Sequence, residues 1–254
     1  MSVAAQLKPQ EMDHWDERVE LAAAARLIYK LNLHEGVANH VSLAVSPDGT
    51  RFLVNPSPAH FGRLKASDML LLDANDDGDV ADSAEKTNRT ALGVHGSVHR
   101  HCPHARCVIH VHCMYSTVLG TLMDANLPPI AQSAVNFYNR YVIDTEYGGL
   151  SFKSEGERCA AMLSDPKKKV MIMGNHGVMV LGANVADAFN RLYYFERAAE
   201  TYIRALQTGQ PLRYLPHEIA EKTSQQLEDY PDYSKAHLAE MRAFLDDEGA
   251  DYAS

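Results

Sequence analysis

Apolar residues recur at helical spacing near both ends of the chain. Between about Met12 and Leu31 they lie three or four positions apart, and Gly36 follows, so we expect a helix that ends before this glycine. The most regular helical pattern begins at Asn184, a residue type that caps helix N-termini, and Gly209 closes it. The apolar positions of this second segment share one face, which predicts a long helix packed on a core.

Three shorter segments are also predicted to be helical. One spans about 90–101 and stops before a proline, and another spans about 116–123. In the third, 154–164, Ser154 stands at the N-cap position and Glu157 follows three residues later, which is a capping-box pattern.

Between these helices, apolar and β-branched residues alternate or cluster as they do in strands. Residues 37–57 form two short runs around a Pro-Asp-Gly turn at 47–49, which is a strong hairpin signal. Residues 169–182 predict a second hairpin with 174–177 at its tip. Single strands are predicted at 105–112, 128–135 and 140–144.

The mixture of helices and strands predicts an α/β protein. A chain of 254 residues fits one generous domain, and neither an internal repeat nor a clear linker divides it. We therefore expect a single domain over 1–254, whose core covers about 18–210. The tail over 211–254 is polar and predicts further helix at about 234–246.

Composition narrows the classes of protein that the chain can belong to. Hydrophobic residues make up 46% and charged residues 22%, as in ordinary globular proteins. No run of about 18 apolar residues occurs, and the N-terminus lacks a secretory signal, so we expect a cytoplasmic protein without a membrane span. The net charge is −9 and the basic residues are scattered, which argues against a nucleic-acid partner.

Histidine is the unusual component. Of 13 histidines, six fall between residues 95 and 112. His110 and His112 stand two apart on a predicted strand, so both imidazoles point to one face, about 6.6 Å apart along the backbone. They could converge on one metal ion, or they could be two polar side chains on the open face of a strand.

His176 lies between glycines at the tip of the second hairpin, where small neighbours let another element approach. Three histidines from two strand ends are a usual ligand set for a catalytic zinc with an open position. Imidazole also suits nickel, copper and iron. The pattern of residues does not by itself bring position 176 to position 110.

Two histidine motifs carry a resemblance to a known family. The run CVIHVHCMYSTVLG is followed some sixty residues later by VMIMGNHGVMVLG and a long helix, and this order resembles the class II aldolase/adducin family. The upstream GVANHVSL and LVNPSP resemble its N-terminal pattern, so that the similarity covers roughly 18–210. The resemblance implies a three-layer αβα sandwich with a central, mostly antiparallel β-sheet.

The resemblance also implies a chemistry and a set of site residues. Enzymes of this family use a divalent metal, usually zinc, to stabilise an enediolate when a carbon–carbon bond breaks. The metal ligands would be His110, His112 and His176. The residues near the positions that hold the phosphate or polar end of a substrate would be Asn39, Ser42, Ser57 and Thr90.

The sequence departs from the pattern of the sugar-phosphate aldolases at the acid/base. Those enzymes carry a glutamate about nineteen residues before the first metal histidine, and that position is Ala91 here, with no carboxylate within three residues. Pro58 stands where the family prefers glycine and removes a backbone donor for phosphate. A metal-bound hydroxide, His95, Tyr138 or Tyr147 could supply the base, although we expect His95 and His99, which share one helix face, to be structural or to support the ligands rather than to be catalytic.

Three functions remain open. The first is a metal-dependent lyase that acts on a small hydroxy-carbonyl compound, sugar-derived or phosphorylated, with a base other than this glutamate. The second is a non-catalytic assembly or binding protein like the adducin heads, which also lack the glutamate. The third is a zinc hydrolase, for which no base can be named. Related enzymes form their sites between subunits, so we expect a homotetramer.

Overall fold

The computed structural model describes residues 12–75, 89–146, 152–230 and 232–254, the side chains of residues 89, 90, 152 and 153 excepted. A seven-stranded sheet forms the centre of the molecule. Its strands are β1 (His40–Ala44), β2 (Arg51–Val54), β3 (Leu70–Asp73), β4 (Cys107–Val111), β5 (Tyr141–Asp144), β6 (Val170–Met173) and β7 (Gly177–Gly182). In space they lie in the order β3-β2-β1-β4-β7-β6-β5, and every neighbouring pair is antiparallel except β5 with β6.

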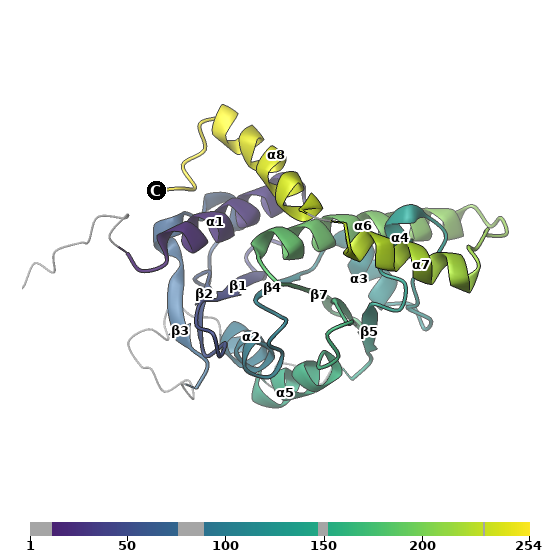
Figure 1. Cartoon of the computed structure of the whole chain (residues 1–254), viewed down its shortest axis with the longest axis horizontal. Helices are drawn as coiled ribbons and strands as arrows, with labels where there is room; N and C mark the ends of the chain where they lie inside the picture. Colours follow the sequence, from purple (N-terminus) through teal and green to yellow (C-terminus); the bar gives the residue numbers. More distant parts are fainter. Residues whose placement is uncertain (1–11, 76–88, 147–151, 231) are drawn as a thin grey trace, which may run out of the picture.

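Helices cover both faces of this sheet. The helical segments are α1 (Trp15–Lys30), η2 (Phe61–Arg63), η3 (Ala66–Asp68), α2 (Arg89–His101), α3 (Met114–Gly120), α4 (Gln132–Val135), α5 (Phe152–Met162), α6 (Val185–Gln207), α7 (His217–Glu228) and α8 (Tyr233–Asp247). Figure 1 shows α1 and α6 on one side of the strands and α2 and α5 on the other. The predicted three-layer αβα sandwich with a mostly antiparallel sheet is confirmed.

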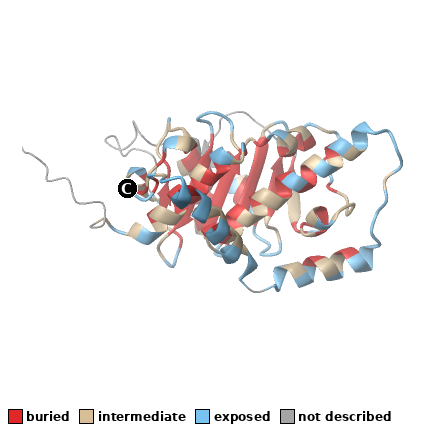
Figure 2. Ribbon diagram, turned by 90° about the horizontal axis from the view of Figure 1, so that it is seen from above, coloured by how far each residue is buried: buried red, intermediate tan, exposed pale blue. Residues whose placement is uncertain are grey.

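Helices pack on both faces of the two central strands, β4 and β7, and their residues are apolar apart from His110. Every residue of β4 and β7 is buried, and Figure 2 shows the buried strands between partly exposed helices. One core cluster lies between the sheet and α1 with α6, and a second lies between the sheet and α2 with α5. The His110–His112 segment is therefore held on a strand that the core fixes from both sides.

Local signals account for most element boundaries. Asn184 caps α6 by accepting a hydrogen bond from the backbone N–H of Asp187 at 2.8 Å. Gly209 follows the helix with a φ of 66°, a left-handed conformation that glycine adopts without steric cost. Both predicted hairpins are confirmed, since β1 pairs with β2 and β6 pairs with β7.

Two local predictions are wrong. Residues 128–135, predicted as a strand, contain the short helix α4 (Gln132–Val135) instead, because Pro128 and Pro129 have no N–H to donate to a strand ladder. The capping box at Ser154 is wrong as well: α5 begins at Phe152, so this serine lies inside the helix.

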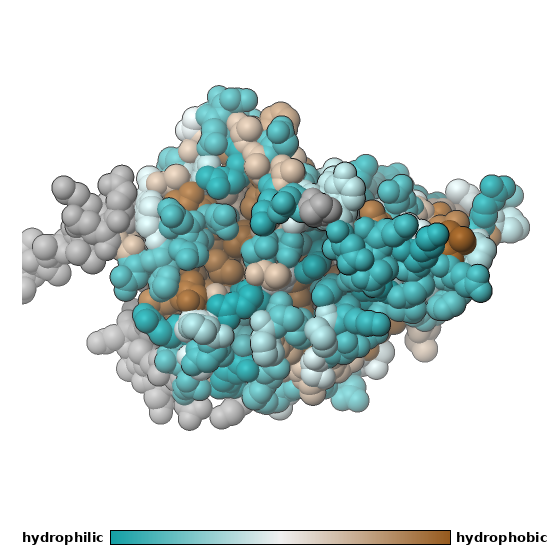
Figure 3. Space-filling model, viewed as in Figure 1, coloured by the Kyte–Doolittle hydropathy of each residue, from teal (hydrophilic) through white to brown (hydrophobic). Residues whose placement is uncertain are grey.

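The C-terminal tail is helical and returns to the body of the protein. Helix α8 contacts α1 and α6, and the backbone N–H of Ala66 donates to the carbonyl of Tyr252 at 2.8 Å. In the view of Figure 3, hydrophilic residues cover most of the surface, and apolar residues show between them. No helix in the described part of the chain has the length and apolar character that crossing a membrane requires.

Candidate metal centre

The sheet brings the three predicted histidine ligands together. His110 lies near the end of β4, His112 follows that strand, and His176 lies in the turn between β6 and β7. Because β4 pairs with β7, with Val111 opposite Val178, the tip of the second hairpin reaches the end of β4. One ligand atom from each histidine lies within 4.8 Å of the other two.

Gly177 permits this close approach. A Cβ atom at position 177 would lie 2.6 Å from Cδ2 of His112 and 2.7 Å from the carbonyl oxygen of Val111, distances at which atoms overlap. Any side chain here would push the hairpin tip away from β4. The small neighbour noted in the sequence is thus a steric requirement of the site.

Hydrogen bonds set the tautomers of two of these imidazoles. Nδ1 of His110 lies 3.2 Å from the carbonyl oxygen of Val178, and Nδ1 of His112 lies 2.6 Å from Oε2 of Glu35. Both partners accept, so both Nδ1 atoms must donate, and each neutral ring then carries a lone pair on Nε2. A metal-ligating histidine has this arrangement, with its second nitrogen bonded to a carbonyl or a carboxylate.

The two Nε2 atoms lie 3.2 Å apart. Two lone pairs at this distance repel, so either a proton or a metal ion must lie between the two nitrogens. Two nitrogen ligands of a tetrahedral ion, each at about 2.0–2.1 Å, are about 3.3 Å apart, which is close to the observed spacing. The residues present therefore fit the divalent metal that the resemblance implies.

Burial favours the neutral form of His110 and His176. It pushes the pKa of His110 well below its usual value, and neighbouring histidines lower this pKa further. Burial, with His112 nearby, lowers the pKa of His176 to about 4, and burial also lowers that of His40 to about 4. Metal ligands must be deprotonated, so these imidazoles can bind an ion without first losing a proton.

Asn39 ties the Glu35 loop to the metal centre. Its Oδ1 accepts from the backbone N–H of Glu35 at 3.1 Å and of His112 at 3.4 Å, while Nδ2 donates to the carbonyl of Glu35 at 2.8 Å. The side chain is fully buried. Asn39 therefore positions the carboxylate that orients His112; its predicted contact with a substrate stays a prediction.

Ser42 joins two buried histidines of α2. Its Oγ lies 2.7 Å from Nδ1 of His95 and 2.8 Å from Nε2 of His99, whose own Nδ1 donates to the carbonyl of Ala105 at 2.9 Å. The carbonyl group can only accept, and this determines the direction of the other hydrogen bonds. The serine hydroxyl donates to Nε2 of His99 and accepts from Nδ1 of His95. Nε2 of His95 is left with a lone pair and has no hydrogen-bond partner among the described residues.

A small cavity is lined both by His95, from this series of hydrogen bonds, and by histidines of the metal centre. Its volume is about 10 Å³, and its lining includes His95, His110, His176 and, unexpectedly, Glu155 of α5. The sequence did not single out Glu155, which the predicted capping box places at the first position of the helix after Ser154. Its signal would have been its spacing from Cys159 and Ala160, which share the buried face of α5.

The other predicted site residues lie on several different elements. Ala91, at the position of the family's glutamate, is buried in an apolar cluster with Phe52 and Val54. Tyr138 bonds through its hydroxyl to Nδ1 of His217 at 3.0 Å, away from the three histidines. Ser57 is half-buried in the loop after β2, and Thr90 lies in the first turn of α2 with its side chain outside the described part. Tyr147 lies outside the described residues.

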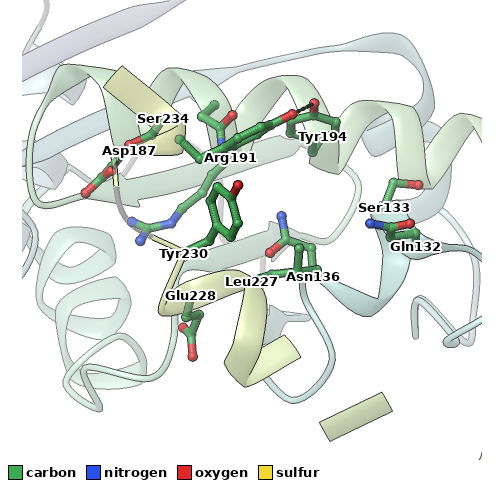
Figure 4. Close-up of a pocket in the computed structure, with 12 residues that line it drawn as sticks. Gln132, Ser133, Asn136, Asp187, Arg191, Tyr194, Leu227, Glu228, Tyr230 and Ser234 are labelled. Carbon is green, nitrogen blue, oxygen red and sulfur yellow. Dashed lines mark hydrogen bonds between the residues drawn. The ribbon is translucent and has the colours of Figure 1, made fainter. Parts of the chain in front are cut away.

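A larger cavity, of about 380 Å³, lies between α6 and the α7–α8 segment (Figure 4). Several of its polar groups have hydrogen-bond partners in the protein. The hydroxyls of Tyr194 and Tyr233 lie 2.7 Å apart, Ser234 donates to Asp187 at 2.5 Å, and Arg191 donates to a backbone carbonyl at 2.6 Å. In the described ranges, the potential metal ligands cluster only at the three histidines.

Comparison with known proteins gives relatives of several activities. The Meiotically up-regulated gene 14 protein of Schizosaccharomyces pombe is 31% identical over 71% of this chain and 69% of its own length. Decarboxylase NovR of Streptomyces niveus is 25% identical over 81% of this chain and 75% of its own length. Alpha-adducin of Mus musculus is 27% identical over 76% of this chain, which spans 26% of that protein.

Solved structures share the fold over nearly the whole chain. An aldolase II superfamily protein from Pseudomonas syringae superposes with a TM-score of 0.83 at 30% identity, covering 98% of both chains. L-fuculose 1-phosphate aldolase from Glaciozyma antarctica PI12 gives a TM-score of 0.81 at 19% identity, covering 99% of this chain and 96% of its own. The family model described as "Class II Aldolase and Adducin N-terminal domain" matches residues 19–203. With its histidine motifs, its sheet and this match in agreement, the chain belongs to the class II aldolase and adducin family.

Proposed function

We propose that the protein is a metal-dependent lyase that breaks a carbon–carbon bond in a small hydroxy-carbonyl compound. His110, His112 and His176 would hold a divalent ion, zinc in the first instance. The observation that carries this proposal is the convergence of three histidines, two of which have an acceptor behind Nδ1 and their Nε2 atoms 3.2 Å apart. Metal-ligating histidines are oriented in this way, with the second ring nitrogen bonded to a carbonyl or a carboxylate.

The residues of the chain have separate tasks in this proposal. When bound, the ion supplies Lewis-acid polarisation of a carbonyl group. Glu35 and the carbonyl of Val178 keep two ligand rings in the required orientation, and Asn39 holds the Glu35 loop in place. Ser57, which is half-buried, and Thr90 are the candidates for contact with the polar end of the substrate, because Ser42 is engaged by two histidines.

The second candidate function is a non-catalytic, adducin-like binding role. The observation in its favour is Ala91, which is buried among apolar side chains where the sugar-phosphate aldolases carry their acid/base. A protein that acts through assembly does not need that carboxylate. Retention of three oriented histidines favours the enzyme, since a relic site has no reason to keep its ligand tautomers.

Metal analysis tests the proposal. Purified protein should contain about one ion per chain, and the His110→Ala/His112→Ala variant should contain almost none, because a single histidine cannot replace a three-nitrogen site. The matched control is His101→Ala/His217→Ala, which removes two exposed histidines and should keep the ion. Metal-free wild-type protein at neutral pH would contradict the lyase.

A substrate screen then decides the reaction. Loaded protein is incubated with L-fuculose 1-phosphate, dihydroxyacetone and small β-keto acids, and cleavage, epimerisation and decarboxylation are followed by NMR. These choices follow the names of the relatives and the chemistry of the site. Turnover that disappears in the double histidine variant supports the lyase; loaded protein without turnover of any kind favours the adducin-like role.

Assembly and location are part of the same proposal. We infer a cytoplasmic homotetramer, because enzymes that resemble this chain complete their sites between subunits. Light scattering after size exclusion should give about four times the mass of the 28.1 kDa chain. A stable monomer at micromolar concentration would exclude a site shared between subunits.

A further inference from the structure

We propose that Glu155 of α5 is the catalytic acid/base of the site and does the work for which related aldolases use a carboxylate at the position of Ala91. This inference rests on the proposed lyase function. It assigns the proton transfer to a residue that lies 64 positions further along the chain and on a different helix.

Glu155 meets the metal centre across the small cavity. Its side chain is 3% exposed, it lines the cavity together with His110 and His176, and its Oε1 is buried without a hydrogen-bond partner among the described residues. His95, whose Nε2 has no hydrogen-bond partner among the described residues, lines the same cavity. A cavity of about 10 Å³ has room for about one water molecule. Two unpartnered acceptors on its wall would hold that water, or a substrate hydroxyl, by both of its hydrogens.

Two other glutamates show what structural roles look like in this protein. Glu196 is 5% exposed, and its carboxylate accepts from the backbone N–H groups of Tyr115 and Ser116 and from the Ser116 hydroxyl, at 2.6–2.8 Å. Glu157 is exposed and pairs with Arg100 at 3.2 Å. Glu155 has neither solvent nor a set of donors for Oε1, and a buried acceptor in that state costs stability. Such a group is retained where function requires it.

Glu155 is not a fourth ligand of the same cluster. Among the described residues, the atoms that lie within 4.8 Å of one another belong to the three histidines alone. The carboxylate is therefore not a member of this cluster, and it lines the cavity in which a substrate group would lie. Burial raises the pKa of Glu155, against the opposing effect of Arg158, which brings its proton affinity closer to that of a group working near neutral pH.

The proton transfer balances without any further reactant. Oε1 of Glu155 takes the proton of the substrate hydroxyl, and the electron pair of that O–H bond forms the new C=O bond. The pair of the breaking carbon–carbon bond moves to the carbonyl group of the other fragment. Glu155 then returns the same proton to the carbon of that fragment, so the carboxylate is regenerated.

The test compares Glu155→Gln with its neighbour Glu157→Gln. We expect Glu155→Gln to lower turnover, or the exchange of α-protons of dihydroxyacetone in D2O, by about 10²–10⁴-fold. Metal content and affinity, measured by chelator competition, should stay at the wild-type level. The melting temperature of the metal-free variant should be unchanged or higher by up to about 4 °C, because the amide removes an unpartnered buried charge. Glu157→Gln should keep turnover within twofold.

Each other outcome overturns the assignment. Full turnover in Glu155→Gln would remove Glu155 and leave the lyase intact. Loss of metal in Glu155→Gln would show that Glu155 is a ligand. A lower melting temperature or failure to fold would show that its role is structural. The variant Glu155→Met, which keeps the volume without a polar group, tests this structural role separately. Wild-type protein that binds metal but neither cleaves nor exchanges overturns the proposed function, and the role of Glu155 with it.

Discussion

The two cavities of this molecule differ in size and in the state of their polar atoms. The larger one, at about 380 Å³, has no residue in its described lining with a buried side-chain polar atom that lacks a partner, and the hydroxyls of Tyr194 and Tyr233 bond to each other. The smaller one, at about 10 Å³, leaves Nε2 of His95 and Oε1 of Glu155 without partners among the described residues. Unsatisfied buried polar atoms are costly, and a substrate group in the smaller cavity would satisfy these two.

The largest effect on stability should come from acid, through the buried residues His40 and His99. Burial lowers the pKa of His40 and of His99 to about 4 in the folded state, whereas an unfolded chain protonates histidine near pH 6.5. The unfolded state therefore binds more protons between these values, so this contribution to stability is complete above about pH 6.5 and is lost as the pH falls towards 4. Metal-free protein should lose roughly 5 kcal/mol of unfolding free energy between pH 7.5 and 4.5 from these two residues.

Urea unfolding at both pH values measures this loss. The variant His99→Asn should show a shallower pH dependence than wild type because it removes one of the two titrating groups. A loss below about 1 kcal/mol in wild-type protein would mean that water reaches both rings in the folded state.

Removal of the Ser42 hydroxyl should come next. Ser42→Ala leaves a buried N–H on His95 and a buried acceptor on His99 without a partner, at a cost of about 1–3 kcal/mol each. We expect a destabilisation of about 2–4 kcal/mol in urea unfolding. Ser234→Ala, at the rim of the larger cavity, is the matched control and should cost less than about 1.5 kcal/mol. Equal destabilisation in the two variants would show that the hydrogen bonds of the two cavities contribute equally to stability.

Glu35→Gln should weaken metal binding without unfolding the protein. The substitution replaces the carboxylate that accepts from Nδ1 of His112, and loss of such a partner typically lowers metal affinity by about 10–100-fold. Competition with a chelator measures the change. Glu228→Gln, a carboxylate of the larger cavity, should leave the affinity as it is. An unchanged affinity in Glu35→Gln would show that His112 needs no partner.

The smallest effect is expected in the larger cavity. Tyr233→Phe removes the hydrogen bond to Tyr194, and since both hydroxyls are exposed to solvent, stability should change by less than about 1 kcal/mol. Metal content and turnover should equal those of wild type. A loss of turnover in this variant would give the larger cavity a part in the chemistry.

Much of the scaffold could be predicted because its signals are local. The β-branched run predicted the strand that contains His110 and precedes His112, and an N-cap asparagine with a closing glycine bounded α6. The predictions failed where the signals of adjacent residues conflicted. The capping-box pattern at Ser154 was overruled by a helix that starts two residues earlier, and paired prolines turned 128–135 from strand to helix.

The sequence by itself determined the ligand types, the two histidine motifs and the family to which they belong. Only the tertiary structure decided what meets at the site. The register of β4 against β7 carries His176 to His112, the loop after α1 carries Glu35 to the same ring, and the packing of α2 against α5 turns Glu155 towards the cavity. These contacts join residues about 20 to 80 positions apart, and no periodicity of a few residues encodes them, because they depend on how whole elements pack.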